Sequence, residues 1–409
     1  MSAQPTEEVL RPQDEKQVLD TVSWAVSESK PLEILGHGSK RGIGAPMQVA
    51  HTLDLSALSG VTLYEPEELV LTARAGTSVA DIEALLCENN QELQFEPMDY
   101  RGLLGNEAER GTFGGLLACN LSGPRRIKAG AARDHVLGIR AVTGRGDIIK
   151  SGGRVVKNVT GYDLSRGLSG SWGTLGVFTE LTFKVLPKSE TCSTLVLSGL
   201  ADGDAADVMA HAMGSDTEAS AAAHLPESVR FCFIDGGLPD GAATVFRLEG
   251  FEPSVRYREK RLRDILGKVG PCESLDAETS AVLWREIRDV KPFCDGTQRA
   301  VWRISIAPSQ GHVLVGSLRL QTGVDAYYDW QGGLVWLRME ADAEADIVRR
   351  TIAKLGGGHA TLVRAPAALR SAFAVFEPQP IALAALSQRL KEQFDPAGVL
   401  NPGRMSGFM

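Results

Sequence analysis

The chain has 409 residues, of which 43% are hydrophobic and 23% are charged, and its formal net charge is −8. This length suits a globular protein of more than one domain. An acidic balance disfavours a nucleic-acid-binding protein, which normally presents a basic face. No apolar run reaches the roughly 18 residues of a membrane span, and the first residues lack the apolar core of a signal peptide. We therefore expect a cytoplasmic protein, with at most peripheral membrane contact through partners.

Metal-binding and nucleophile motifs are missing from the sequence. The six cysteines and seven histidines are scattered, without the close spacings of zinc or iron–sulfur ligands. There is no Walker phosphate loop and no G-x-S-x-G nucleophile elbow. We expect free thiols and no bound metal.

The first half of the chain alternates helices and strands around glycine-rich turns. Asp14 and Gln17 can form a capping box ahead of a helix with Val18, Val22 and Val26 on one face. A strand over 31–35 follows, and a second helix begins near Ser78. Further on, the sequence predicts a hairpin with strands 135–142 and 147–150, and a strand within 173–187 that Pro187 ends.

The region after residue 190 is expected to be a separate α+β unit without an internal repeat. Hairpins mixed with helices indicate an antiparallel sheet covered by helices on one face. The predicted strands are 193–198, 229–234, 243–248, 300–306, 325–329, 334–339 and 358–363. The predicted helices are 203–213, 254–268, 278–288, 342–355 and 381–394.

The turn after strand 31–35, "GHGSKRG" at 36–42, is the clearest candidate for a binding loop. Glycines let backbone N–H groups approach a phosphate closely, and Lys40 and Arg41 add positive charge. A diphosphate is therefore a natural ligand. A Rossmann fold is disfavoured, because Arg41 occupies the place of the third glycine and no helix follows.

More turns rich in glycine or small residues follow in the same half of the chain, at 111–115, 120–123, 129–135 and 173–177. A flat, extended ligand that contacts the backbone along its length would require this pattern. FAD is such a ligand.

The order of these motifs resembles a known family. The chain resembles FAD-binding proteins of the vanillyl-alcohol-oxidase and PCMH type. The motifs that carry the resemblance are "GHGSKRG", "ARAGTSVADIEALL", "GTFGGLLACNLSG", "GRVVKNVTGYDL" and "GSWGTLGVFTELTFKVLP", followed by a distant "FDPAGVLNPGRM". The segments 281–290, 301–309 and 329–337 resemble the cap of the FAD-binding E subunits of bacterial glycolate oxidases within that family.

The resemblance implies an α+β architecture with an inserted cap. A PCMH-type, two-lobed FAD-binding domain would occupy 1–188. The cap, an antiparallel sheet covered by helices, would occupy 189–375 and face substrate or partner. The segment 376–409 would return to the FAD-binding domain.

The resemblance also assigns cofactor-binding residues. Those expected to contact FAD are Gly36, His37, Gly38, Ser39, Lys40, Arg41 and Gly42 in the pyrophosphate loop, then Pro97, Thr112, Gly114, Gly115, Ser122, Gly123, Arg133, Gly176 and Val177. Some members attach FAD through a histidine just after a glycine pair. Because His37 stands one place earlier, between Gly36 and Gly38, we expect noncovalent FAD.

Oxidation of a 2-hydroxy acid requires a cation for the carboxylate and a base for the hydroxyl proton. Lys157, His359 and Arg364 are the candidates for these catalytic roles, with Arg303 and Tyr328 as further possibilities and structural roles open for each. Larger relatives carry an arginine where this chain has Val156, and a histidine cluster where it has His359 alone. Both departures weaken the case for substrate oxidation by this chain alone.

Three functions remain open. The first is the FAD-binding subunit of a glycolate dehydrogenase that oxidises glycolate to glyoxylate beside a larger FAD-binding subunit and an iron–sulfur subunit. The second is a free-standing FAD-dependent oxidase or dehydrogenase of another alcohol or hydroxy acid. The third is a non-catalytic partner that keeps the flavin fold or relays electrons. Val156 and the missing histidine cluster favour the first and third functions over the second. The retained glycine turns favour the first over a flavin-free version of the third.

Overall fold

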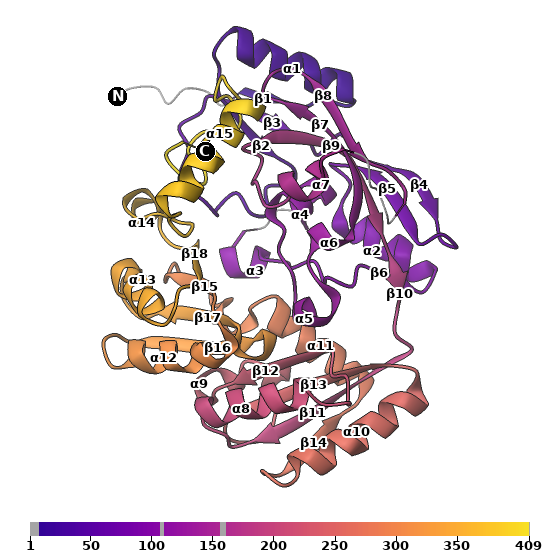
Figure 1. Cartoon of the computed structure of the whole chain (residues 1–409), viewed down its shortest axis with the longest axis vertical. Coiled ribbons are helices and arrows are strands. Elements are labelled where there is room, and N and C mark those ends of the chain that lie inside the picture. The colour runs from indigo at the N-terminus through magenta and orange to yellow at the C-terminus, as the bar shows by residue number, and fades with distance from the viewer. Residues whose placement is uncertain (1–7, 107–109, 156–160, 409) are drawn as a thin grey trace.

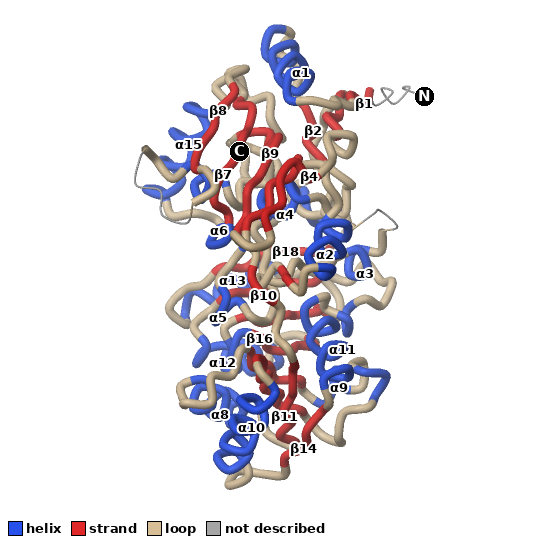
Figure 2. Tube along the Cα trace, turned by 90° about the vertical axis from the view of Figure 1, so that its right-hand side faces the viewer, coloured by secondary structure: helices blue, strands red, loops and turns tan. Residues whose placement is uncertain are grey.

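The computed structural model describes residues 8–106, 110–155 and 161–408 and shows two lobes stacked along the long axis (Figure 1). The first lobe carries two main sheets and the C-terminal segment, and the second carries one large sheet (Figure 2). Lys157, one of the predicted catalytic residues, lies outside the described residues.

The first lobe combines a parallel and an antiparallel sheet. The parallel sheet has the order β1-β3-β2, and the antiparallel sheet has the order β4-β5-β9-β7-β8. A short pair, β6 with β10, lies beside them. The strands are β1 (Glu8–Leu10), β2 (Leu32–Leu35), β3 (His51–Asp54), β4 (Val61–Glu65), β5 (Val70–Arg74), β6 (Gln91–Glu92), β7 (Val136–Thr143), β8 (Ile148–Gly152), β9 (Gly176–Lys184) and β10 (Leu186–Pro187).

Side-chain caps begin the longer helices of this lobe. Asp14 accepts a hydrogen bond from the Gln17 amide at 2.8 Å, which starts the first helix as predicted. Ser78 and Thr112 cap the second and fourth helices. The helices are α1 (Glu15–Ser27), α2 (Val79–Glu88), α3 (Arg101–Leu104), α4 (Phe113–Cys119), α5 (Arg126–Ala129), α6 (Ala132–His135) and α7 (Leu164–Leu168).

The second lobe is built from two units with the same topology, so the expectation of no internal repeat is wrong at the level of the fold. Each unit runs strand, helix, strand, strand, helix, strand, and the two join through β12 and β16 into one sheet of order β14-β11-β13-β12-β16-β17-β15-β18. The strands are β11 (Thr191–Ser198), β12 (Ala221–Leu225), β13 (Ala243–Gly250), β14 (Cys272–Leu275), β15 (Val301–Ser305), β16 (Val324–Asp329), β17 (Leu334–Met339) and β18 (His359–Arg364).

Helices cover both faces of this sheet, whereas the sequence predicted one covered face. Four helices pack on the face away from the first lobe, and α11 packs on the opposite face through Leu283, Trp284 and Ile287. The helices are α8 (Asp202–Met213), α9 (Glu227–Arg230), α10 (Glu252–Leu266), α11 (Ala277–Arg288), α12 (Gly311–Arg319) and α13 (Ala345–Lys354). The predicted strand at 229–234 is wrong, because α9 and a 3-10 turn occupy it.

The C-terminal segment leaves the second lobe and packs against the first. It contains α14 (Ala367–Ala372) and α15 (Ile381–Phe394). Leu400 pairs with Leu32 at the free edge of β2. The Asn401 side chain accepts from the Ile34 amide at 2.7 Å and donates to the Trp172 carbonyl at 2.8 Å. These bonds place the residues after Asn401 beside the glycine-rich turn 36–42.

Buried charges join the two lobes. Arg247 of β13 donates to Glu96 of the first lobe at 2.6 Å, and the Arg125 amide donates to the other Glu96 oxygen at 2.8 Å. Burial alone would raise the pKa of Glu96, but Arg125 and Arg247 together lower it to about 2. Glu96 is therefore ionised over the whole physiological range, and buried ion pairs join the lobes.

Candidate functional site

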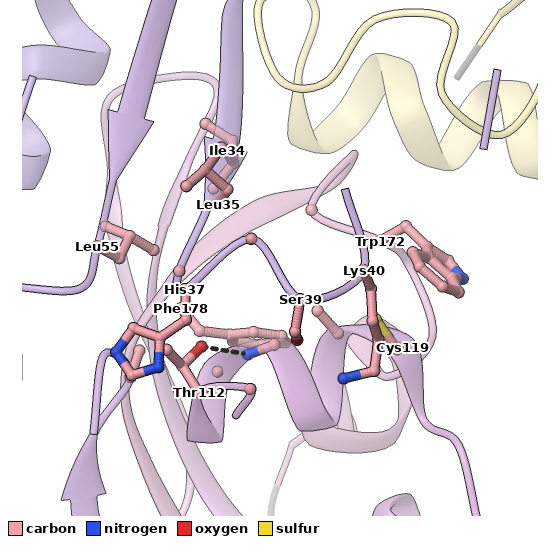
Figure 3. A pocket seen from close by; sticks show the side chains of 18 of the residues that line it. Ile34, Leu35, His37, Ser39, Lys40, Leu55, Thr112, Cys119, Trp172 and Phe178 are labelled. Carbon is pink, nitrogen blue, oxygen red and sulfur yellow. Dashed lines mark hydrogen bonds between the residues drawn. The ribbon is translucent and has the colours of Figure 1, made fainter. Parts of the chain in front are cut away.

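A pocket lies between the two main sheets of the first lobe (Figure 3). The parallel sheet contributes the end of β2 and the loop that follows it. The antiparallel sheet contributes Gly176 and Phe178 of β9, and α4 contributes its first turns. The predicted residues that line the pocket are Gly36, His37, Gly38, Ser39, Lys40, Arg41, Thr112, Gly114, Gly115 and Gly176.

The glycines of the 36–42 loop are needed for different reasons. A Cβ on Gly36 would lie 2.3 Å from the Thr112 hydroxyl oxygen, so Gly36 is required by close packing against α4. Gly38 has φ +71°, a conformation that favours glycine, and a Cβ there would meet no atom within 4 Å. A Cβ on Gly42 would also enter open space. The loop therefore leaves room beside Gly38 and Gly42 for a ligand.

The backbone of this loop has free hydrogen-bonding capacity. Within the described residues, the amide N–H groups of Gly38, Ser39 and Lys40 donate to no protein acceptor. Consecutive unpaired amides are the feature that binds phosphate oxygens in anion-binding loops.

Three cations line the pocket, and one of them was not predicted. Arg41 is held by Glu33, with the Arg41 Nε 2.9 Å from the carboxylate, so much of its charge is neutralised. Among the described residues the Lys40 ammonium has no ion-pair partner. Arg404 from the C-terminal segment is 6% exposed, lies over the Trp172 ring at 5.6 Å and donates to the Lys40 carbonyl at 3.1 Å. Burial lowers the pKa of Arg404, and its Nε has no hydrogen-bond partner within the described part of the chain.

The wall opposite the loop is the beginning of α4. Thr112 accepts from the Gly115 amide at 3.2 Å and caps the helix. A Cβ on Gly114 would lie 2.8 Å from Ala75, so glycine is needed there for packing against the end of β5. The motif 111–115 is therefore a helix N-terminus facing the pocket, an arrangement that favours anionic groups.

Several predicted cofactor residues do not line this pocket. Val177 points to the other face of β9 and packs with α1, because strand residues alternate between faces. Gly123 accepts a hydrogen bond from the Trp330 indole at the lobe junction. Ser122 is buried, and its hydroxyl has no hydrogen-bond partner among the residues that the structure describes, whereas Arg133 is exposed. Pro97 and Gly42 line neighbouring cavities, and their contact with FAD, like that of the other four, stays a prediction.

Residues that the sequence analysis missed complete the pocket. Most are apolar or small, and all except Leu55 stand in motifs or in the strand that the sequence analysis had already singled out. The missed residues are Ile34, Leu35, Leu55, Ala75, Gly111, Ala118, Cys119, Trp172, Gly173, Phe178 and Arg404. Burial raises the pKa of the Cys119 thiol, so this group is protonated at neutral pH.

The predicted catalytic residues are not gathered at the pocket. His359 is exposed at the start of β18. Arg364 is 3% exposed and donates to the Leu103 and Phe293 carbonyls at 3.1 and 2.6 Å, so its guanidinium is occupied in joining segments. Tyr328 donates to Asp202 at 2.6 Å on the face of the second lobe's sheet that carries α12 and α13, away from the pocket.

In the part of the chain that the structure describes, no cluster of three or more His, Cys, Asp or Glu side chains could hold a metal ion. Within the same residues no helix is both long and apolar enough to cross a bilayer.

Similar folds occur among solved structures. A family model described as "FAD binding domain" matches residues 6–152. The crystal structure of p-cresol methylhydroxylase shares the fold with a TM-score of 0.70 and 14% identity, and the match covers 98% of this chain and 88% of that one. The structure of alkyldihydroxyacetonephosphate synthase shares it with a TM-score of 0.69 and 18% identity, and the match covers 96% of this chain and 76% of that one. Fold, pocket and family match define a FAD-dependent oxidoreductase of the PCMH type, and FAD is its cofactor.

Relatives that are similar in sequence show the family to which the chain belongs. The chain is 37% identical over 388 residues to glycolate oxidase subunit GlcE of Escherichia coli, covering 95% of this chain and 96% of that one. It belongs to the GlcE family of glycolate oxidase subunits. A 38% match to glycolate oxidase subunit GlcD of Bacillus subtilis covers 33% of this chain and 27% of GlcD. D-Lactate dehydrogenase of Archaeoglobus fulgidus is 30% identical over 46% of this chain and 41% of that enzyme.

The residues present fit FAD. Bound FAD supplies the acceptor for hydride from a CH–OH group. The unpaired amides of Gly38, Ser39 and Lys40 suit a diphosphate, and the Lys40 ammonium adds charge beside them. The buried Arg404 guanidinium supplies a positive group that suits an anionic or electron-rich part of the cofactor.

Proposed function

We propose that this chain is the FAD-binding subunit of a multi-subunit glycolate dehydrogenase that oxidises glycolate to glyoxylate. The observation that carries the proposal is the match to E. coli GlcE along nearly the whole of both chains. Lys40 and Arg404 in the glycine-lined pocket support FAD binding by this chain itself.

The proposed partners are a larger FAD-binding subunit and an iron–sulfur subunit. The larger subunit would contribute substrate-binding groups that this chain lacks at Val156 and around His359. The iron–sulfur subunit would take the electrons, because this sequence has no grouped cysteines. We place the complex in the cytoplasm, against the inner face of the cytoplasmic membrane through its partners.

Coexpression tests the proposal. The tagged chain is purified alone, with the larger subunit, and with both partners, and glycolate-dependent reduction of an artificial acceptor is measured for each. We expect FAD on the chain alone, little activity alone, and turnover in the usual enzyme range of about 1 to 1,000 per second with both partners. Cell fractionation of the coexpressing strain tests the proposed location.

Three results would contradict parts of the proposal. Turnover of glycolate by the isolated chain at a typical enzyme rate would make it a free-standing oxidase. A complex that stays fully active when this chain carries no FAD would make it a non-catalytic partner. Flavin that stays in the pellet after acid precipitation would show that the cofactor is covalent.

A further inference from the structure

The helix α15 is held against the first lobe by a lysine. Lys391 is the one residue of α15 that is buried. Its ammonium donates to the Thr174 carbonyl at 2.7 Å, to the Leu400 carbonyl at 3.1 Å and to the Asp395 carboxylate at 2.6 Å. All three ammonium hydrogens therefore have acceptors, as a buried charge requires. These bonds fix which side of α15 faces the lobe.

The large apolar side chains of α15 lie on another side of the helix. Leu383, Leu386 and Leu390 follow the spacing i, i+3, i+7, which places them on one flank, and they are 46%, 55% and 40% exposed. Ile381, at the start of the helix, is 90% exposed. Among the described residues, no other helix leaves as many large apolar side chains in solvent. Since a helix usually turns such a stripe towards the core, this leucine flank (Leu383, Leu386 and Leu390) has the character of a binding surface.

The charges of α15 do not suit a membrane surface. Helices that lie in the membrane interface carry several Lys or Arg beside their apolar side, where they meet anionic headgroups. The exposed charged residues of α15 are Arg389 and Glu392, whose formal charges cancel, and Lys391 is occupied inside. Apolar anchors at i, i+3, i+7 on a nearly neutral helix are typical of a helix that binds in an apolar groove of another protein.

The size of this surface disfavours a second copy of the chain as the partner. With its 14 residues, α15 is about 21 Å long and about 10 Å across, so one side of it offers roughly 300 Å². A stable interface buries about 800 Å² on each partner. Two copies that meet through α15 would bury less than half of that area. A groove that encloses the helix covers more than one of its sides and the chain at its ends.

The helix α15 belongs to the segment that covers one wall of the flavin pocket (Figure 1). Phe376 precedes α15, and its ring centroid is 5.3 Å from that of Trp172, which lines the pocket. Arg404 follows α15 and lies over the same ring. Within α15, Lys391 bonds to Thr174, two positions after Trp172. A protein bound to α15 is therefore separated from this wall of the pocket by little more than the helix itself.

We propose that the leucine flank of α15 is the docking surface for the electron-accepting iron–sulfur subunit, which receives the helix in an apolar groove. The inference rests on the proposed function, in which that subunit takes the electrons. The two electrons of each oxidised CH–OH group pass one at a time to its clusters, and the two protons leave to water. Because electron transfer slows as the distance between redox centres grows, the acceptor has to bind near the flavin pocket, where α15 lies.

Coexpression of the complex with variants of this chain tests the docking surface. Leu386→Glu and Leu390→Glu each place a carboxylate on the leucine flank, and the helix should be kept because Glu and Leu have similar helix propensities. Ala385→Glu adds the same charge at an exposed position on another side of α15 and is the matched control. The tagged chain is captured from each strain, and the copurified subunits, the FAD content and the melting temperature are measured.

The expected result is a selective loss of one subunit. Leu386→Glu should keep its FAD and its melting temperature, because this side chain is exposed in the free chain. In a titration with the purified, cluster-loaded iron–sulfur subunit, its affinity should fall about 10- to 100-fold, because a carboxylate would be buried in an apolar groove. Ala385→Glu should bind as the wild type does. Leu386→Met, which keeps the apolar surface, should retain most of the affinity.

Four results would overturn the assignment. Unchanged binding of the iron–sulfur subunit by both leucine variants would remove the flank from that interface. Loss of the larger FAD-binding subunit instead would make α15 the docking site of that subunit. Conversion of wild-type dimers to monomers by Leu386→Glu would assign the flank to a second copy. Cosedimentation of the wild type, but not of Leu386→Glu, with vesicles of anionic phospholipid would assign it to the membrane.

The same strains separate this inference from the proposed function. A wild-type complex that oxidises glycolate, with leucine variants that keep the iron–sulfur subunit, would refute the docking surface alone. A complex that does not oxidise glycolate but loses the iron–sulfur subunit in Leu386→Glu would support the docking surface and refute the proposed function. A wild-type chain that does not bind this subunit at all would refute both.

Discussion

The 36–42 loop and the lobe junction are built in different ways. The loop presents backbone amides, and its glycines supply either a left-handed φ or space for a neighbour. The junction is built from charged and aromatic side chains far apart in sequence, as in the pairs Arg247–Glu96 and Trp330–Gly123. A site made of backbone amides can be recognised in the sequence by its glycines. Contacts between side chains that are far apart in the sequence produce no local pattern.

The largest expected effect concerns the junction. Burial raises the pKa of Asp329, next to Trp330, to about 8, far above its value in the unfolded chain. The folded state therefore holds a proton that the unfolded state releases. This contribution to stability is complete below about pH 4 and is lost as the pH rises towards 8. The loss amounts to several kcal/mol, because each tenfold difference in proton affinity between the folded and unfolded states is worth about 1.4 kcal/mol.

Urea unfolding at pH 5, 6.5 and 8 measures this effect. The stability of Asp329→Asn relative to wild type should increase steadily with pH, because Asn carries no proton to lose and still accepts from the Trp330 amide. Glu96 does not interfere, since its pKa of about 2 places its titration below this range. A stability difference that does not change with pH would show that Asp329 is already ionised in the folded protein.

Arg404 links the two regions, so its replacement should affect the cofactor more than the fold. Arg404→Met keeps most of the side-chain volume and removes the charge. We expect FAD to bind about 10- to 100-fold more weakly in a fluorescence titration. The apoprotein should melt at the same or a higher temperature, because a buried guanidinium without a carboxylate partner is costly. A less stable apoprotein with unchanged FAD affinity would assign Arg404 to packing only.

Two glycines of the loop should respond differently to the same change. Gly36→Ala places a methyl group against Thr112 and should lower the free energy of unfolding by about 1–3 kcal/mol. Gly42→Ala enters open space and should have little effect on stability. Denaturant unfolding of the two apoproteins measures both. Equal losses would mean that the contact of Gly36 with Thr112 does not set the loop conformation.

The smallest effect is expected at His37. Its Nδ1 is 2.8 Å from the Arg110 carbonyl oxygen. His37→Ala should therefore cost about 1 kcal/mol of stability and leave the FAD content unchanged. Acid precipitation should release the flavin from both proteins. Flavin retained in the wild-type pellet but released from the variant would identify His37 as a covalent attachment point.

Local patterns in the sequence predicted much of the first lobe. The cap of α1 at Asp14, the cap of α2 at Ser78 and the hairpin of β7 and β8 depend on residues close in sequence. The α15 bounds were predicted as the structure has them. The strands of the second lobe were harder to predict from the sequence. β12, an alanine-rich strand at 221–225, lacks the alternation that marks a half-buried strand, since all its residues are buried.

The sequence by itself determined that this is a flavoprotein of a particular family, because the order of its glycine-rich turns marks where the backbone must approach a ligand or a neighbouring strand. Only the tertiary structure decided which charged side chains are available to a ligand in the pocket. Arg41 is neutralised by Glu33, and Arg364 is occupied by carbonyls. Arg404 reaches the Lys40 carbonyl although the two residues are 364 positions apart in the sequence. The availability of a cation depends on its distance to the nearest acceptor, and distances between remote segments are set by packing.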